Sequence, residues 1–184
     1  MIYLEFLAFC CELDERLLPL VCIVKYLCSK HGILGHGLGS HMSSYTLVLL
    51  ILFFLQIKKE IPSVEQLQDG LPTDMIESWN FAFSRNNMRR KSVSSDSSID
   101  ELLEELFSFY ATFDFEALMV CPLLGTALKK HDMVDGRELP ARLAQNPHFC
   151  RSKPQLNVNS VLAVQDPFEV KPSLELLVIF ICLS

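Results

Sequence analysis

The sequence predicts a mainly α-helical fold that contains one short β element near residues 158–164. Two apolar segments support this prediction: residues 14–30 repeat leucine and valine at helical spacing, and residues 47–55 form an unbroken apolar run. A third segment, residues 98–113, combines a capping signature with an apolar stripe on an otherwise acidic helix. Three helical segments against one short β candidate make helices the dominant elements.

Length and composition limit the kind of protein that this is. The chain has 184 residues, half of them apolar, with a mean hydropathy of +0.28 and a net charge of −6. That length suffices for one domain with a core, or for a piece of a larger protein. The apolar content indicates surfaces that something else covers, and the negative charge argues against a broadly basic nucleic-acid-binding protein.

Cysteines and apolar runs bear on the compartment. The seven cysteines lie mostly inside apolar runs, which predicts reduced thiols and an intracellular location, in cytoplasm, nucleus or mitochondrion. The apolar N-terminus contains Glu5 and Glu12 and has no basic start, so we expect no signal peptide. The runs at 47–55 and 174–183 are about half of a bilayer span, so we interpret both as buried segments and keep a membrane anchor as the minor alternative.

The first predicted helix covers residues 14–30, and Gly32 is its predicted stop. Lys25 and Ser29 are four residues apart on this helix and share a face, with Lys30 beside them. Two interpretations of Lys25 stay open. It is either a solvated lysine on an amphipathic helix or a cation directed at an anion site that the next helix forms.

The second predicted helix begins at Ser43-Ser44-Tyr45 and ends near Ile57. Its serines suit a helix cap, and residues 31–40 before it contain four glycines. A glycine-rich approach to a capped helix leaves backbone N–H groups free where the helix dipole favours an anion. The same pattern is typical of a plain helix–helix connector, so an anion site and a connector both stay open.

The remainder is predicted to alternate between connections and short elements. Residues 61–98 form a long connection, in which the basic run 89–92 is either a kinase site or a solvated loop. The acidic helix begins at a capping box over residues 98–101 and ends near Phe113. Prolines and glycines punctuate residues 121–159, which predicts short helices and loops before the β element.

The sequence contains no recognisable catalytic centre. His31, His36 and His41 are five residues apart without a second close pair, so no metal site is predicted. Asp114-Phe115-Glu116 is a carboxylate pair with the spacing that two-metal nucleotidyl transfer uses. Because it follows a predicted helix, we interpret it as a solvated pair.

Six short motifs occur in a fixed order along the chain: Leu13-Asp14-Glu15-Arg16-Leu17-Leu18-Pro19-Leu20-Val21, Val24-Lys25-Tyr26, Ser43-Ser44-Tyr45, Phe54-Leu55-Gln56, Trp79-Asn80-Phe81 and Gln165-Asp166-Pro167-Phe168-Glu169. By these motifs, over roughly residues 6–170, the chain resembles the terminal uridylyltransferases and related poly(A) RNA polymerases of the DNA polymerase β-type nucleotidyltransferase superfamily. No single motif is specific, but the ordered combination is.

The resemblance implies a fold and a set of contacts. In this family the matching region is the helical central domain with its poly(A)-polymerase-associated (PAP-associated) segment, which closes over the nucleotide opposite a catalytic palm. By resemblance, Lys25 contacts the triphosphate, Ser44 contacts a phosphate and Tyr45 stacks on the base. The family's second lysine falls at Ser29 here, with Lys30 one step away. The full-length family implies Mg²⁺, UTP or ATP, and an RNA 3′ end, whereas we expect no cofactor for this chain alone.

The same resemblance divides the chain into four parts. They are a nucleotide-facing helical part (1–60), a linker with a disordered basic and serine-rich loop (61–98), the PAP-associated segment (99–171) and an atypical apolar tail (172–184). The family's palm, with its metal-binding aspartates, precedes this region and is not found in the sequence. We therefore expect a fragment or isoform of an enzyme that adds UMP or AMP to RNA 3′ ends, inactive by itself.

Two alternatives from other classes stay open. The chain is a non-catalytic interaction protein or pseudoenzyme, or it is a small membrane-associated protein that uses its apolar runs. Without a palm, part of the apolar surface near residues 1–12 and 160–184 is expected to lie open, where a protein partner covers it.

Overall fold

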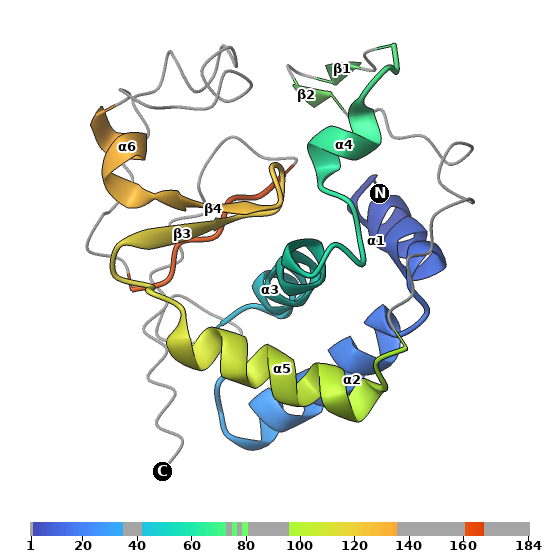
Figure 1. Ribbon diagram of the computed structural model, residues 1–184, viewed down its shortest axis with the longest axis vertical. Helices are drawn as coiled ribbons and strands as arrows, with labels where there is room; N and C mark the ends of the chain where they lie inside the picture. Colours follow the sequence, from blue (N-terminus) through green and yellow to red (C-terminus); the bar gives the residue numbers. More distant parts are fainter. Residues whose placement is uncertain are drawn as a thin grey trace.

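The computed structural model describes residues 2–34, 42–72, 75–76, 79–80, 96–135 and 161–167. In chain order their elements are α1 (Ile2–Leu13), α2 (Leu17–Lys30), α3 (Ser44–Ile57), α4 (Val64–Gln68), β1 (Met75–Ile76), β2 (Trp79–Asn80), α5 (Ile99–Thr112), β3 (Leu118–Cys121), β4 (Thr126–Lys129) and α6 (Lys130–Asp135). The described part of the chain is mainly helical, as predicted (Figure 1).

Helix α3 is the centre of the fold. Figure 1 shows it nearly end-on, with α2 and α5 below it and the β3–β4 hairpin above it. Every residue from Leu49 to Gln56 is buried. A helix that is apolar on all sides needs neighbours on all sides, and α2, α5 and both strands of the hairpin contact α3. The unbroken apolar run is therefore a buried segment, as predicted.

The ends of α2 and α3 follow the local sequence. Gly32 adopts a φ of +66°, which lets the backbone N–H of Ile33 donate to the carbonyl of Cys28 at 2.9 Å and ends α2. Helix α3 begins where the Ser43 Oγ accepts a hydrogen bond from the backbone N–H of Thr46 at 3.0 Å. Both predicted boundaries are confirmed.

Helix α5 also begins and ends where predicted. The Ser98 Oγ accepts from the backbone N–H of Glu101 at 3.2 Å, and the Glu101 carboxylate accepts from the backbone N–H of Ser98 at 2.7 Å. This is the predicted capping box. The helix ends at Thr112, with Phe113 as its C-cap.

Helix α1 buries one apolar face and exposes apolar surface on the other. Phe6, Phe9 and Cys10 are at most 2% exposed and belong to the main core, whereas Leu4 is 73% exposed. In the C-terminal described segment, Leu162 is also buried. Part of the apolar surface near both ends therefore lies open, as expected, at Leu4 and at Val161, which is 46% exposed, while the inner face of α1 and Leu162 pack into the core.

Strands β3 and β4 pair in antiparallel register along their full length. On its other side β3 receives a third segment, because Val164 forms a parallel bridge with Val120. The backbone N–H of Val120 donates to the Ala163 carbonyl at 2.9 Å, and the Gln165 N–H donates to the Val120 carbonyl at 2.8 Å. The predicted β element is thus present at its last residues, while 158–160 lie outside the described residues.

The β3–β4 hairpin itself was not predicted. Its second strand lies in the region 121–159, where the sequence indicates short helices and loops. Each strand has four residues, which is too short for a two-residue periodicity to be distinguished from one helical turn.

The predicted connection 61–98 contains ordered elements as well. Helix α4 begins with a capping box in which Ser63 and Gln66 exchange hydrogen bonds, and its Leu67 is buried. Strands β1 and β2 form a small antiparallel pair. The basic run 89–92 lies outside the described residues.

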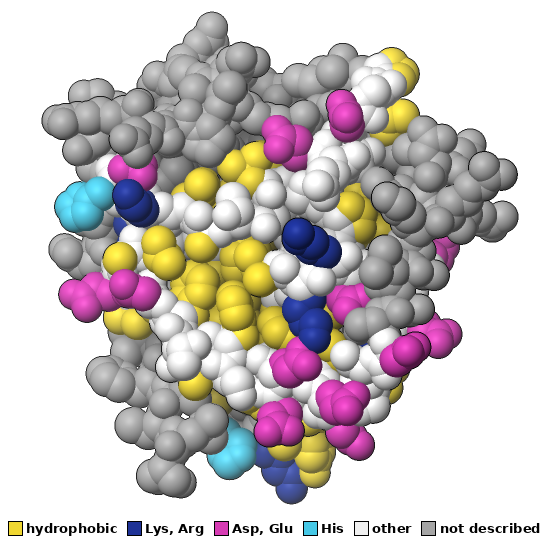
Figure 2. Space-filling model, viewed as in Figure 1, with side chains coloured by type: hydrophobic (Ala, Val, Ile, Leu, Met, Phe, Trp, Pro, Cys, Tyr) yellow, Lys and Arg dark blue, Asp and Glu magenta, His cyan; other side chains and the backbone are white. Residues whose placement is uncertain are grey.

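Aromatic rings fill the junction of α3 and α5. The ring centroids of Phe53 and Phe109 are 6.3 Å apart, and those of Phe109 and Phe113 are 5.7 Å apart. The Tyr110 Oη donates to the carbonyl of Leu50 at 2.7 Å, which ties the two helices together. Figure 2 shows apolar side chains gathered in the middle of this face of the molecule.

Candidate functional site

The candidate site lies where α2 ends and α3 begins. The backbone N–H of Met42 donates to the carbonyl of Ile33 at 2.9 Å, and Leu34 forms a parallel bridge with Met42. This pairing closes the connection between the two helices, so α3 starts beside the end of α2. Residues 35–41, which include most of the predicted glycine loop, lie outside the described residues.

Tyr45, the second residue of α3, is held by a residue near the other end of the chain. Its Oη donates to the Asp166 Oδ1 at 3.1 Å, although the two residues are 121 positions apart. Tyr45 is half-buried, and Asp166 is only 5% exposed. A hydrogen bond to a carboxylate is stronger than one between neutral groups, so this bond holds the end of the tyrosine ring in place.

Ser44 is the first residue of α3 and is half-buried. The N-cap is its neighbour Ser43, whose Oγ is hydrogen-bonded both to the backbone N–H of Thr46 and to the Thr46 Oγ1, at 3.0 and 2.9 Å. The Ser44 hydroxyl is therefore not used for capping. Ser44 belongs to the first turn of α3, whose backbone N–H groups and helix dipole favour negative charge.

Lys25 and Lys30 are both exposed on α2. The Lys30 Nζ lies 5.4 Å from the centroid of the Tyr26 ring, which is 60% exposed. Among the described residues, Lys25 makes no ion pair. The structure thus brings Tyr45 together with Asp166, while the two lysines occupy the solvent-facing surface of the helix that leads to α3.

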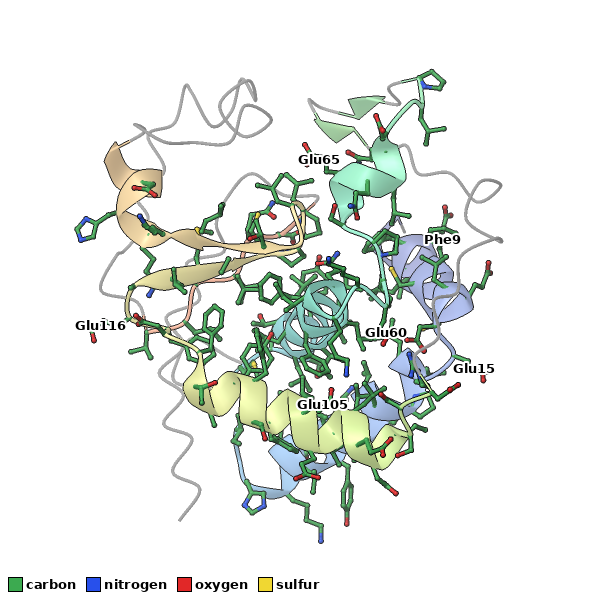
Figure 3. The ribbon with its side chains drawn as sticks, in the orientation of Figure 1. Phe9, Glu15, Glu60, Glu65, Glu105 and Glu116 are labelled. Carbon is green, nitrogen blue, oxygen red and sulfur yellow. The ribbon has the colours of Figure 1, made fainter. Side chains whose placement is uncertain are left out.

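A buried charged cluster, which the sequence analysis did not identify, holds the turn before α2. The Arg16 guanidinium donates to both carboxylate oxygens of Asp14 at 2.8 and 2.9 Å, to Glu60 at 3.1 Å and to the carbonyl of Ser97 at 3.0 Å. Glu60 points toward this turn and the exposed Glu15 points away from it (Figure 3). The cluster joins the α1–α2 turn to the end of α3 and the approach to α5.

The electrostatics of this cluster favour the charged forms. Burial raises the pKa of the Asp14 carboxyl, but the hydrogen bonds and charge of Arg16 outweigh burial and leave that pKa below its usual value. The same hydrogen bonds raise the pKa of Arg16. The sequence does contain a signal for this ion pair, because Asp14 lies two positions before Arg16 at the start of a helix. Both residues belong to the first resemblance motif, to which the sequence analysis assigned no role.

The predicted solvated carboxylate pair is confirmed. Asp114 and Glu116 are both exposed in the turn between α5 and β3. The Asp114 Oδ1 accepts from the backbone N–H groups of Glu116 and Ala117 at 3.1 and 3.0 Å, so it caps the turn. Across the described residues, no three His, Cys, Asp or Glu side chains group closely enough to hold a metal ion.

The alternative of a membrane anchor depends on the apolar run of α3 and on the C-terminal run at 174–183. Within the described part of the chain, no helix is long and apolar enough to span a bilayer. The C-terminal run lies outside the described residues.

Known proteins resemble this chain in sequence and in structure. A family described as Cid1 family poly A polymerase, the PAP-associated family, matches residues 98–172. The speckle targeted PIP5K1A-regulated poly(A) polymerase of Danio rerio is 32% identical over 176 residues, covering 90% of this chain and 22% of that protein. Its Xenopus tropicalis counterpart is 29% identical over 173 residues, covering 90% of this chain and 19% of that protein.

Solved structures match nearly the whole chain. The apo form of mtPAP has a TM-score of 0.72 and 22% identity, covering 94% of this chain and 32% of that one. Cid1 in complex with the UTP analogue UMPNPP has a TM-score of 0.67 and 23% identity, covering 93% of this chain and 49% of that one. These matches show the fold, which is the mainly helical part of a nucleotidyltransferase.

The matched family and the poly(A) polymerase relatives then identify the family. The chain belongs to the terminal nucleotidyltransferases, of which it contains the central and PAP-associated region. It spans about a fifth of the length of the two relatives named above.

Proposed function

We propose that this chain is the nucleotide-facing region of an RNA terminal nucleotidyltransferase, which adds UMP or AMP to RNA 3′ ends together with a catalytic palm. The relatives named above are poly(A) polymerases, and mtPAP has been solved in complex with UTP. The observation that carries the proposal is the contact of Tyr45 with Asp166. Tyr45 and Asp166 belong to two different resemblance motifs, and their side chains meet at the start of α3.

Each predicted site residue has a physical role in this proposal. The ring of Tyr45, anchored at its hydroxyl, offers its face to a base. Ser44 and the first-turn N–H groups of α3 contact a phosphate, because a helix N-terminus favours an anion. The exposed ammonium groups of Lys25 and Lys30 neutralise the triphosphate.

We also propose that these 184 residues do not transfer nucleotides by themselves. Two-metal transfer needs carboxylates that reach a shared pair of ions. Asp114 and Glu116 do not fit that role, because they are exposed and the Asp114 carboxylate is bonded to backbone N–H groups of its own turn. Incubation with Mg²⁺, UTP or ATP and an RNA primer should give no extension, and metal-dependent extension would contradict this proposal.

The experiment that tests the nucleotide-facing role is binding of Mg-UTP and Mg-ATP to the purified chain. Lys25→Ala and Tyr45→Ala should each abolish or strongly weaken binding. Lys129→Ala, which removes an exposed lysine from β4, is the matched control and should bind as the wild type does. Absence of binding in a demonstrably folded sample would overturn the proposal.

A gain-of-function variant sharpens the same test. Ser29 is exposed on α2, one turn beyond Lys25, where the family resemblance places a second lysine. Ser29→Lys adds a cation on the face that carries Lys25, so it should raise the affinity for both triphosphates. An unchanged affinity would indicate that this face does not meet the phosphates.

The domain division and the location belong to this proposal as well. We assign nucleotide contact to residues 1–60, and we assign the positioning of these contact residues to the PAP-associated segment 99–171. Residues 61–98 link the two parts, and residues 172–184 form a separate tail. An intracellular location in cytoplasm, nucleus or mitochondrion goes with RNA 3′-end processing.

A non-catalytic interaction protein is the second candidate. The observation that favours it is the exposure of large apolar side chains on α1 and α2: Leu4 is 73% exposed and Leu18 is 57% exposed. A protein partner that covers this surface fits both candidates. Concentration-dependent association that Leu18→Glu abolishes, in a folded chain that binds no nucleotide, would favour this second candidate.

A further inference from the structure

We propose that Asp166 is a positioning residue, whose carboxylate holds the ring of Tyr45 in the place where it stacks on a nucleotide base. This inference rests on the proposed function and deepens it. It assigns a role to a buried acid outside the helices that carry the predicted contacts.

The contact itself is the first part of the argument. The side chain of Tyr45 is fixed at one end by its backbone in the first turn of α3, and at the other end by the 3.1 Å hydrogen bond to Asp166. With both ends fixed, the ring retains only rotation about its own long axis. Because Asp166 is 5% exposed, water competes weakly for this bond.

The rigidity of Asp166 is the second part. Its neighbour Gln165 is buried, and the backbone N–H of Gln165 donates to Val120 of β3 at 2.8 Å. The Gln165 Oε1 accepts from the backbone N–H of Leu123 at 3.3 Å, and its Nε2 donates to the Asp166 carbonyl. Asp166 is therefore held by the sheet, so that the PAP-associated segment sets the position of a ring on α3.

The third part concerns which base the ring can recognise. A phenol has one proton to donate, and here Tyr45 donates it to Asp166. Tyr45 then has no donor left for the edge of a base and offers its aromatic face. Stacking accepts every base, so the Tyr45 hydroxyl does not discriminate UTP from ATP.

The test measures equilibrium binding of Mg-UTP and Mg-ATP to the full chain by saturation-transfer NMR and calorimetry. The variants are Tyr45→Phe, Asp166→Ala, Asp166→Asn and the double variant Tyr45→Phe/Asp166→Ala. Tyr110→Phe is the matched control, since it removes a buried phenol that donates to Leu50 at the α3–α5 junction.

Tyr45→Phe and Asp166→Ala should each weaken binding about three- to tenfold, the effect of one net hydrogen bond, and by the same factor for both nucleotides. The double variant should bind no more weakly than either single variant, because both remove the same bond. Asp166→Asn keeps an oxygen that can accept from Tyr45, so it should restore most of the affinity. Tyr110→Phe should bind as the wild type does.

Each other outcome overturns a defined statement. If the wild type binds nucleotide and Tyr45→Phe and Asp166→Ala bind equally well, Asp166 does not position the ring, while the proposed function stands. If the folded wild type binds neither nucleotide, the proposed function and this inference both fail. If Asp166→Ala does not fold, the affinities of Tyr45→Phe and Asp166→Asn decide whether Asp166 positions the ring. A loss in Tyr45→Phe that differs between UTP and ATP would overturn the absence of discrimination.

Discussion

At the α1–α2 turn, Arg16 buries its guanidinium against the carboxylates of Asp14 and Glu60, at 2.8 and 3.1 Å. At the start of α6, Lys130 is more deeply enclosed, at 2% exposure, and its Nζ donates to backbone carbonyls, including that of Phe115 at 2.6 Å. In the helical part a cation thus meets buried carboxylates, whereas in the sheet part a buried cation donates to backbone carbonyls.

The pKa shifts show what this difference does. Arg16 lowers the pKa of Asp14 in spite of its burial, so the pair contributes stability that acid removes. Burial lowers the pKa of Lys130, and the attraction of Asp114 and Glu116 only partly opposes this. The two regions should therefore respond to opposite ends of the pH scale, and five changes test this contrast.

Removing Arg16 should have the largest effect. Arg16→Met keeps the length of the side chain but removes the cation that pairs with two buried carboxylates, which should cost about 3 kcal/mol in the free energy of unfolding. Urea denaturation at neutral pH measures this cost. Glu15→Gln, at the exposed neighbouring position, is the control and should change stability little.

The acid response of the same cluster has a defined direction. The folded-state pKa of Asp14 lies below its ordinary value of 3.8, so its contribution is present above that pH and is lost as the pH falls through the folded-state pKa. Asp14→Asn should flatten the loss of stability in this acidic window. An unchanged acid profile would show that Arg16 does not depress the pKa of Asp14.

Gly125→Ala should have the next largest effect, in the sheet part. Gly125 has a φ of +64°, and an added Cβ would lie 2.9 Å from the Cβ of Ser63. We expect a cost of about 2 kcal/mol, from backbone strain plus overpacking. Gly70→Ala is the matched control, with a φ of +70° and open space, and should cost about 1 kcal/mol. The difference in stability between Gly125→Ala and Gly70→Ala, measured by thermal unfolding, should be the same at pH 5 and pH 8, because neither substitution changes a charged group.

Lys130→Met should have a smaller and pH-dependent effect. Between its lowered folded-state pKa and its ordinary value of 10.5, the unfolded chain binds a proton that the folded chain does not. The wild type should therefore gain stability relative to Lys130→Met as the pH rises toward 10.5. The difference between the two unfolding free energies at pH 7 and pH 10 measures this gain. A difference that does not change with pH would contradict it.

Lys58→Ala should have the smallest effect. Lys58 pairs with Glu105, whose side chain is 48% exposed, and lies 5.9 Å from the centroid of the Phe54 ring. An ion pair this close to solvent contributes about 0.5 kcal/mol or less, and salt screens it. The difference in the free energy of unfolding between the wild type and Lys58→Ala should shrink when unfolding is measured at high salt instead of low salt. A cost near that of Arg16→Met would remove the contrast between buried and exposed pairs.

Local patterns were enough to predict helices α2, α3 and α5 and their ends, except that α2 begins at Leu17 and not at Asp14. The stop at Gly32, the cap at Ser43 and the box at Ser98 each depend on residues within four positions of one another. Hairpin β3–β4 was missed because its strands are too short to show a period.

The residues of the candidate site could be named from the sequence, but their contacts could not. Tyr45 and Asp166 both lie in resemblance motifs, yet no local spacing relates two positions 121 residues apart. The same holds for Arg16 and Glu60, 44 positions apart. Such pairs are set by tertiary packing, which brings together ends of elements that sequence periodicity treats separately.

The long separation between Tyr45 and Asp166 also orders events during synthesis on the ribosome. Helices α2 and α3 are complete once residue 57 has emerged, and chains fold from the N-terminus as they are made. Asp166 emerges more than a hundred residues later, together with the segment that pairs with β3. We therefore expect Tyr45 to acquire its final orientation only at the end of translation of this region, so that a nascent chain paused before residue 161 would carry the helices without an ordered tyrosine.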